Sequence, residues 1–357
     1  MYVVVGGNPG RLNAIVDVDG VRVGHHHRLD ERWATGTSAV VTPEGAAAAV
    51  DVRGGGPGTR ETDVLHPTHL VQQVHAIVLT GGSAYGLAAA NGAMRWLAER
   101  GHGFPVGATP HEVVPIVPAA VLFDLPMGQW GNRPDATFGY AACDAATASE
   151  LRQGNVGAGT GAVAGSVKGG IGTASTVLSG EISAAGATVG ALVAVNSSGS
   201  VIDPATGLPW AAELELDGEF GLRRPDGAEV EAARERAARR PARHGTAARP
   251  LNTTIGAVAT DVTLNKAECH RLAVAAHDGL ARAVRPAHAM TDGDTVFALS
   301  TGRTPGPGSR ESWAGTLDEL CAAAADTVSR AIVHAVLAAD PVGDVIGYTH
   351  LYRSARE

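Results

Sequence analysis

The stretch LNTTIGAVATDV, residues 251–262, decides how the C-terminal part of this chain folds. Its β-branched residues predict a strand that starts abruptly after an irregular segment. The following sequence predicts an amphipathic helix over 265–284, a second strand over 295–300 and a second helix over 317–338. This succession of strand, helix, strand and helix indicates a layered fold in which helices cover a sheet.

Upstream of this unit lies a charged and Arg-rich segment, residues 211–250, which contains three prolines. Its composition predicts a surface loop or linker. Earlier in the chain, strands are predicted over 75–80 and 187–195, and a hairpin over 14–23. The first of these strands ends at Gly81 and Gly82 and opens a helical pattern over 83–100, so the backbone amides of this turn are candidates to bind an anion or oxyanion.

The composition points to a globular protein that packs through small side chains. Of 357 residues, 47 are Gly and only 4% are aromatic, which favours helices lying close against sheet in an α/β or α+β architecture. We find no internal repeat and treat residues 1–357 as one domain. The formal net charge of −8 argues against a nucleic-acid partner, because phosphate binding needs clustered Lys and Arg.

Compartment and cofactor requirements are also indicated by the residues present. Three widely spaced cysteines without a CxxC pair suit free thiols in a reducing compartment, and no signal or membrane-spanning segment is recognised, so we expect a cytoplasmic protein. Three consecutive histidines, residues 25–27, cannot share one strand face, which makes a metal site there improbable. Gly159-Thr160-Gly161 imitates a dinucleotide fingerprint, but no strand is predicted before it, and a structural turn is the better interpretation. We therefore expect no metal and no organic cofactor.

Thr253, near the start of the 251–262 strand, is a candidate nucleophile. A threonine hydroxyl needs a base beside it, and one recurring solution is the α-amino group of the same threonine. An internal threonine acquires that amine only if the backbone is cut just before it, here between Asn252 and Thr253. Threonine is also common at strand starts because β-branched residues suit a pleated surface, so the local pattern leaves both interpretations open.

Five segments, in this order, resemble the L-aminopeptidase D-amidase/D-esterase (DmpA-like) family of self-processing hydrolases, especially its nylon-oligomer (6-aminohexanoate oligomer) hydrolase branch. They are AVDVRGGGPGTRE (49–61), LTGGSAYGL (79–87), GNVGAGTGAVAGSVKGG (154–170), NTTI (252–255) and MTDGDTVFA (290–298). The resemblance implies an α+β fold, a layered αββα sandwich of the type shared with ornithine acetyltransferases. It also implies self-cleavage into an α chain, residues 1–252, and a β chain, residues 253–357.

The resemblance further implies the site residues. The family's nucleophile matches Thr253, its oxyanion-stabilising asparagine matches Asn196, and the lysine and acidic pair of the nylon-oligomer branch match Lys168, Asp292 and Asp294. On this basis we expect the two carboxylates to orient the freed ammonium and hydroxyl of Thr253, and Lys168 to offset their charge. The amides of Gly81 and Gly82 are expected as a second oxyanion donor. Each motif also has a plainer interpretation: TDGD suits an acidic turn, Lys168 suits a surface cation in a glycine-rich loop, and Asn196 suits a turn.

One position departs from the family pattern. Phe123 stands where the family has an active-site tyrosine, so the role of that hydroxyl is either absent or taken by another residue such as Tyr85. The leading functional hypothesis is an amide hydrolase acting on a small peptide or amide through an acyl-enzyme. The alternatives are an acyltransferase of the ornithine acetyltransferase type and a ligand-binding protein that is never processed. Because the family tends toward tetramers, we expect a homo-oligomer.

Overall fold

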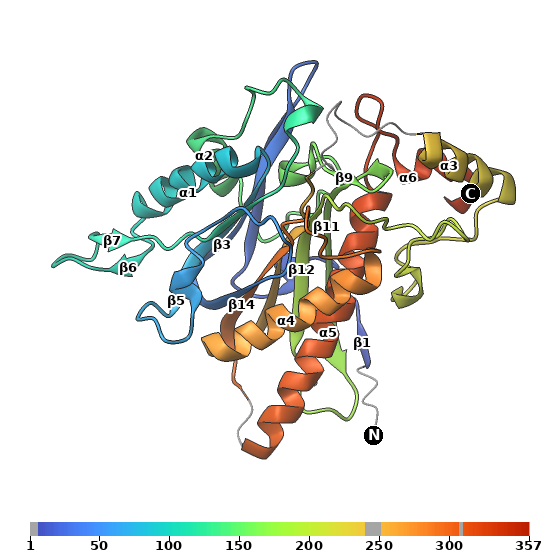
Figure 1. The fold of residues 1–357 in the computed structure, drawn as a ribbon. Coiled ribbons are helices and arrows are strands. Elements are labelled where there is room, and N and C mark those ends of the chain that lie inside the picture. The colour runs from blue at the N-terminus through green and yellow to red at the C-terminus, as the bar shows by residue number, and fades with distance from the viewer. Residues whose placement is uncertain (1–5, 240–250, 307–309, 357) are drawn as a thin grey trace.

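Two β layers lie between two helix layers in the computed structural model, which describes residues 6–239, 251–306 and 310–356 (Figure 1). The first layer runs in the order β1 (Gly6–Asn8), β11 (Gly170–Ser179), β12 (Thr188–Val195), β13 (Ile255–Val262) and β14 (Thr295–Thr304). The second contains β3 (Ala34–Val52), β2 (Arg22–Leu29), β5 (Gln73–Thr80), β8 (Ala119–Val121) and β4 (Thr59–Arg60). Small hairpins are formed by β6 (Phe104–Pro105) with β7 (Val113–Val114) and by β9 (Val163–Ala164) with β10 (Val167–Lys168).

The long strand β3 joins the two layers. Its C-terminal half pairs with β14, and its N-terminal half pairs with β2 and β5. The pairing with β5 shifts register between Val41 and Ala46, where Gly45 has a φ of +84° that other residues rarely adopt. The strand therefore changes direction near this glycine and passes from one layer to the other.

Alternating side chains along the strands separate the three hydrophobic zones of the sandwich. On β13, Ile255 and Ala257 face the core between the two β layers, whereas Val258 faces the helices. On β5, Ile77 points into the same inner core and Val78 points to the opposite helix layer. Because side chains of a strand alternate between its two faces, both β layers are covered on both sides. The predicted αββα sandwich is confirmed.

Two pairs of helices form the outer layers. Helices α4 (Lys266–Ala283) and α5 (Arg310–Leu337) cover the β11 to β14 layer, and α1 (Ala89–Ala98) and α2 (Ala136–Asp144) cover the other (Figure 1). The remaining helices are α3 (Gly227–Arg239) and α6 (Tyr348–Leu351). The segment Ser312–Leu337 of α5 has the length and composition of a membrane span, but 78% of its most apolar window is buried in the structure. A helix at the centre of a protein core has the same character.

The predicted strands and helices of the C-terminal unit are confirmed, but the predicted hairpin over 14–23 is wrong. The segment Ile15–Asp17 forms a 3-10 helix, and strand β2 begins only at Arg22. The Asp17 carboxylate accepts hydrogen bonds from the amides of Leu12 and Ala14, which closes a compact turn that strand periodicity does not reveal.

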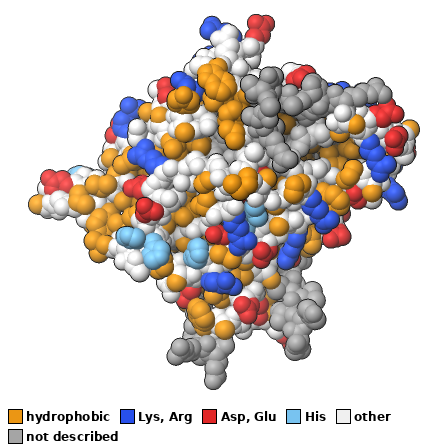
Figure 2. Space-filling view, in the orientation of Figure 1, with side chains coloured by type: hydrophobic (Ala, Val, Ile, Leu, Met, Phe, Trp, Pro, Cys, Tyr) orange, Lys and Arg blue, Asp and Glu red, His pale blue; other side chains and the backbone are white. Residues whose placement is uncertain are grey.

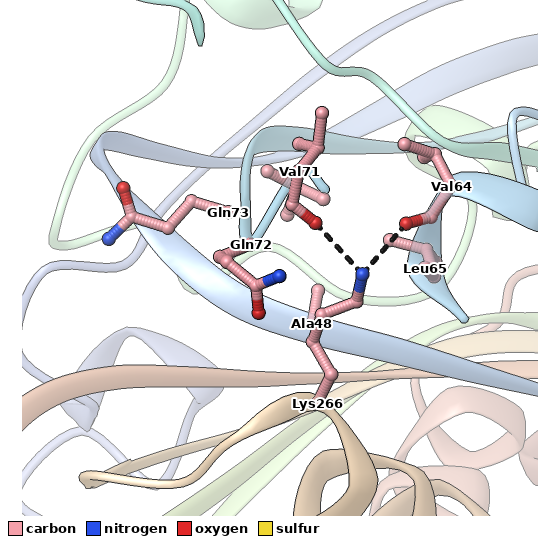
Figure 3. Close-up of a pocket in the computed structure, with 8 residues that line it drawn as sticks. Ala48, Val64, Leu65, Val71, Gln72, Gln73 and Lys266 are labelled. Atoms are coloured by element: carbon pink, nitrogen blue, oxygen red, sulfur yellow. Dashed lines mark hydrogen bonds between the residues drawn. The ribbon is translucent and has the colours of Figure 1, made fainter. Parts of the chain in front are cut away.

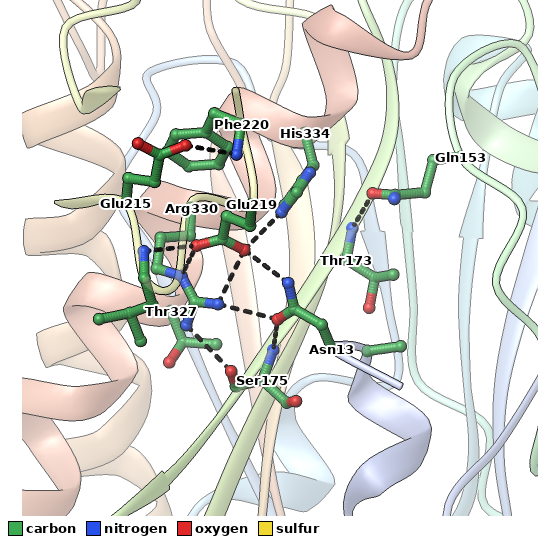
Figure 4. Close-up of polar contacts among 12 residues, drawn as sticks. Asn13, Gln153, Thr173, Ser175, Glu215, Glu219, Phe220, Thr327, Arg330 and His334 are labelled. Atoms are coloured by element: carbon green, nitrogen blue, oxygen red, sulfur yellow. Dashed lines mark hydrogen bonds and ion pairs between the residues drawn. The ribbon is translucent and has the colours of Figure 1, made fainter. Parts of the chain in front are cut away.

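The charged segment 211–250 contains more structure than a surface loop or linker. It forms helix α3, and Glu219 is anchored in the protein by Arg330 of α5, whose side chain is fully buried (Figure 4). The five N–H donors of this guanidinium all have partners, which lie on Glu219, Asn13, Ser175 and Thr176. Part of the prediction, residues 240–250, lies outside the described residues.

Candidate active site

Thr253 lies just before β13 and is 5% exposed. The structure is that of the continuous chain, so the nitrogen of Thr253 belongs to a peptide bond. This amide donates to the backbone oxygen of Asn196 at 2.6 Å. The Thr253 hydroxyl donates to the carbonyl oxygen of Asn252 at 2.5 Å. The hydroxyl therefore lies against the carbonyl group of the peptide bond at which cleavage is predicted.

The same carbonyl group also accepts a hydrogen bond from the TDGD turn. Asn252 forms a bridge with Asp292, in which the Gly293 amide donates to the Asn252 oxygen at 3.1 Å and the Asn252 amide donates to Thr291. A Cβ atom at Gly293 would lie 2.8 Å from the Thr253 hydroxyl oxygen, so only glycine leaves room for this approach. A donor at this oxygen stabilises the negative charge that develops when a carbonyl group is attacked.

The triple glycine of the RGGGPG segment packs against the TDGD turn. The Gly56 amide donates to the Asp292 backbone oxygen at 2.8 Å, and a Cβ at Gly54 would lie 2.3 Å from the Asp294 nitrogen. Two of the segments that carry the family resemblance thus meet beside the Asn252–Thr253 peptide bond, because glycine allows their backbones to approach closely.

The carboxylates of Asp292 and Asp294 are both buried beside Thr253, but they bind backbone amides. Asp292 accepts from Ser198 at 3.1 Å and from Ala289 at 3.1 Å, and Asp294 accepts from Thr254 at 2.9 Å. Burial, followed by the charge of Asp294, raises the pKa of Asp292. In the continuous chain these carboxylates therefore fix the backbone around Thr253. Their contact with the freed ammonium stays a prediction.

Asn196 is brought to the site, with its side chain oriented by two backbone groups. Its amide oxygen accepts from Val163 at 2.9 Å, and its Nδ2 donates to the Phe123 oxygen at 3.3 Å. The second hydrogen on Nδ2 remains as a candidate oxyanion donor, since a primary amide carries two. The oxyanion role of Asn196 stays a prediction.

Lys168 is fully buried, but its charge partner differs from the predicted one. Its Nζ donates to the oxygens of Gly159 at 2.9 Å and Gly169 at 2.7 Å. Burial lowers the pKa of Lys168 to about 7, and the negative charge that opposes this shift belongs to Asp124. Burial in turn raises the pKa of Asp124 to about 6. The negative charge that acts on Lys168 thus belongs to Asp124. The acidic pair that Lys168 was expected to offset accepts hydrogen bonds from backbone amides and, at Asp294, from the His288 side chain.

The turn at Gly81 and Gly82 binds an anion that belongs to the protein itself. The Gly82 amide donates to Asp124 Oδ1 at 2.7 Å, and the Gly81 amide donates to Gly36 at 2.9 Å. A Cβ at Gly81 would lie 2.1 Å from Asp124 Oδ2, so the glycine makes room for this carboxylate. Both amides are already used, and the expected second oxyanion donor is not available at either position.

The two predicted aromatic positions lie toward the surface of this region. Tyr85 is 57% exposed, and the Arg133 guanidinium lies 3.8 Å from its ring centroid. The Phe123 ring is 6.3 Å from that of the exposed Trp130, while its backbone oxygen receives the Asn196 side chain. Phe123 therefore contacts Asn196 through its backbone oxygen, and this contact does not require a tyrosine hydroxyl.

Sequence reasoning missed three residues of this region: Asp124, Gly293 and His288, whose Nδ1 lies 2.9 Å from Asp294 Oδ2. Asp124 follows a short buried strand, and a charged residue at such a position could have been identified as a candidate site residue. The TDGD pattern predicts only a turn at Gly293, because the Gly293 amide acquires its role only when Asn252 lies beside it. His288 had no signal in its local sequence.

Other surface features lie apart from this site. A small pocket around Lys266 shares no lining residue with it, and the Lys266 ammonium there donates to the oxygens of Val64, His69 and Val71 (Figure 3). On the face shown in Figure 2, Lys and Arg side chains are interspersed with Asp and Glu. Within the described parts of the chain, no cluster of three or more His, Cys, Asp or Glu side chains is arranged to hold a metal ion.

The chain is similar to known proteins over most of its length. The sequence profile of Peptidase family S58 matches residues 13–349. An uncharacterized aminopeptidase of Mycobacterium tuberculosis is 49% identical over 356 residues, covering 96% of this chain and 99% of that protein. A 6-aminohexanoate-oligomer endohydrolase of Paenarthrobacter ureafaciens is 30% identical over 334 residues, covering 92% of this chain and 86% of that protein.

The fold is also found among solved structures. The L-aminopeptidase D-Ala-esterase/amidase of Ochrobactrum anthropi, described as a variant of the Ntn hydrolase fold, superposes with a TM-score of 0.71. The match covers 98% of this chain and 94% of that chain at 23% identity, so it bears on the fold alone. Taken with the profile match over most of the sequence, these relationships show that the chain belongs to peptidase family S58 and is a hydrolase of peptide or other amide bonds.

Proposed function

We propose that the chain cleaves its own backbone between Asn252 and Thr253, and that Thr253 then serves as the N-terminal nucleophile of an amide hydrolase. The observation that carries the proposal is the position of the Thr253 hydroxyl, 2.5 Å from the Asn252 oxygen, which also receives the Gly293 amide. This arrangement supports the proposal, because a hydroxyl, a carbonyl group and a donor to the carbonyl oxygen lie together in the continuous chain.

In the cleavage step, the Thr253 oxygen bonds to the Asn252 carbonyl carbon and the bond from that carbon to the Thr253 nitrogen breaks. The hydroxyl proton passes to the departing nitrogen, which becomes an amine, and the two segments are joined by an ester. Water then hydrolyses the ester, leaving a carboxylate on Asn252 and restoring the Thr253 hydroxyl. The products are the proposed α and β chains.

In the mature enzyme, the freed amine is the base for the adjacent hydroxyl. An α-amino group has an ordinary pKa of about 7.7 to 8, so a sizeable neutral fraction exists near pH 7. The backbone oxygen of Asn196 accepts from this nitrogen in the continuous chain, which supports a role for it in orienting the amine after cleavage. Attack on a substrate amide gives an acyl-enzyme, and water releases the product.

For the substrate, we propose a short linear peptide or oligoamide. The support comes from relatives named aminopeptidase and 6-aminohexanoate-oligomer endohydrolase. We further propose that the working form is a homo-oligomer, a tetramer of cleaved protomers, in the cytoplasm.

The test uses the two adjacent threonines as a matched pair. Thr254 is fully buried beside Thr253, and its hydroxyl has no hydrogen-bond partner among the described residues. Intact mass and N-terminal sequencing should detect a fragment beginning at Thr253 in the wild type and in Thr254→Val, but not in Thr253→Val. An uncut wild-type chain would contradict the proposal and favour a ligand-binding protein. Product formation that requires an added amine acceptor would instead indicate an acyltransferase.

A further inference from the structure

His288 lies in the loop between α4 and β14 and makes two contacts with one carboxylate. Its backbone amide donates to Asp294 Oδ2 at 3.1 Å, and its Nδ1 lies 2.9 Å from the same oxygen. An ionised carboxylate only accepts hydrogen bonds, so Nδ1 must carry the proton in this contact. The side chain is 20% exposed.

Asp294 connects this histidine to the strand that carries the nucleophile. While Oδ2 receives the two donors of His288, Oδ1 accepts from the Thr254 amide at 2.9 Å. The Thr254 oxygen in turn accepts from the Thr295 amide at 3.1 Å. The carboxylate therefore fixes the backbone one residue after Thr253, and its own orientation depends on both oxygens being held.

We propose that His288 is a positioning residue for self-cleavage, whose Nδ1–H orients the Asp294 carboxylate and thereby holds Thr253 against the Asn252 carbonyl group. This inference rests on the proposed function.

Two features of His288 disfavour a purely structural role. Its φ is +57°, a left-handed conformation that is uncommon for residues other than glycine, and its Nε2 is buried with no partner in the described part of the chain. Neither feature stabilises the fold. Strained residues of this kind persist where the surroundings impose them, often at functional sites.

Among the described residues, Asp294 is the only hydrogen-bond partner of His288. On α4, the His277 ring packs edge-on at a centroid distance of 4.9 Å, and its Nε2 lies 3.0 Å from the Asp51 backbone oxygen. Burial lowers the pKa of His277 to about 4, so this neighbour is neutral near pH 7. The charges of Asp51 and Arg53 act on His277.

The test compares residues at position 288 that tolerate a positive φ but differ in whether they can donate a hydrogen bond to Asp294. Asn, Asp and Gly all tolerate the left-handed conformation, and Asn and Asp have nearly the same shape. In His288→Asn the side-chain amide replaces the Nδ1–H donor, whereas His288→Asp places a second carboxylate against Asp294. His288→Gly removes the donor without adding repulsion, and Asp217→Gly is the control, since Asp217 has a similar φ of +52°.

The measured quantity is the rate of fragment formation by the full-length chain after a short pulse of cell-free synthesis. We expect His288→Asn and Asp217→Gly to cleave at close to the wild-type rate. His288→Gly should be about 10- to 100-fold slower, the effect of losing one hydrogen bond to a charged group, and His288→Asp slower still. If His288→Asp does not fold, the comparison of Asn with Gly decides.

Equal rates for the Asn and Gly variants, beside a wild type that cleaves, would overturn the positioning role alone. A wild type that yields no fragment beginning at Thr253 would overturn the proposed function and this inference with it.

Discussion

Replacing Glu219 by glutamine should destabilise the protein strongly, because it removes the counter-charge of a fully buried arginine. Glu219 has a side-chain exposure of 7% and accepts hydrogen bonds from Arg330, His334 and Asn13 (Figure 4). Glutamine keeps the shape but leaves the Arg330 charge without its partner. Breaking a buried ion pair in this way costs about 3 to 5 kcal/mol.

The free energy of unfolding should be measured by urea titration in a Thr253→Ala background, in which the chain is expected to stay continuous. The matched control is Glu44→Gln, because Glu44 forms an equally direct pair with Arg303 at 2.6 Å but is 74% exposed. The control should change the free energy by less than about 1 kcal/mol. A loss for Glu219→Gln no larger than that of the control would refute the reasoning.

The burial of Glu219 beside Arg330 also predicts that the stability of the protein depends on pH in the acid range. Burial alone would raise the pKa of Glu219, but hydrogen bonds from His334 and Arg330 hold it well below its usual range. A depressed pKa stabilises the fold fully above the ordinary glutamate pKa of about 4.3, and this stabilisation is lost as the pH falls further. Between pH 5 and pH 3, the wild type should therefore lose more stability than Glu219→Gln. A steeper acid loss in the variant would contradict this assignment.

Two further substitutions test local features. Gly293→Ala places a methyl group 2.8 Å from the Thr253 hydroxyl oxygen and should slow self-cleavage more than about 10-fold, whereas Gly131→Ala, which meets no atom within 4 Å, should not. Equal rates of fragment formation in the two variants would count against the Gly293 contact. Lys266→Met removes the ammonium that binds three loop carbonyls and should speed hydrogen exchange in that loop about 10-fold, the effect of roughly 1.4 kcal/mol. The exposed Arg271→Met is the control, and unchanged exchange in Lys266→Met would show that the loop is held by other contacts.

Periodicity was sufficient for the parts of the fold that depend on local pattern. The strand at 251–262 and the helix at 265–284 correspond to β13 and α4, whose start is fixed by the Asn265 capping box. Periodicity failed at residues 14–23, where side-chain hydrogen bonds from Asp17 replace strand pairing. Periodicity also did not reveal that Glu219 is buried. Its partner Arg330 lies 111 residues away in the sequence, so the charged segment around Glu219 resembles a solvent-exposed loop.

The candidate site shows the same division. The sequence by itself determined which residue types are present, namely Thr253, the acidic pair around Gly293, and the glycine-rich segments that resemble one family. Only the tertiary structure decided their partners: Lys168 donates to the backbone oxygens of Gly159 and Gly169, and Gly293 donates to the Asn252 carbonyl group. The physical reason is that hydrogen bonds and charge interactions act over a few ångströms. They depend on which distant segments the paired strands bring together, and a pattern of neighbouring residues does not contain that information.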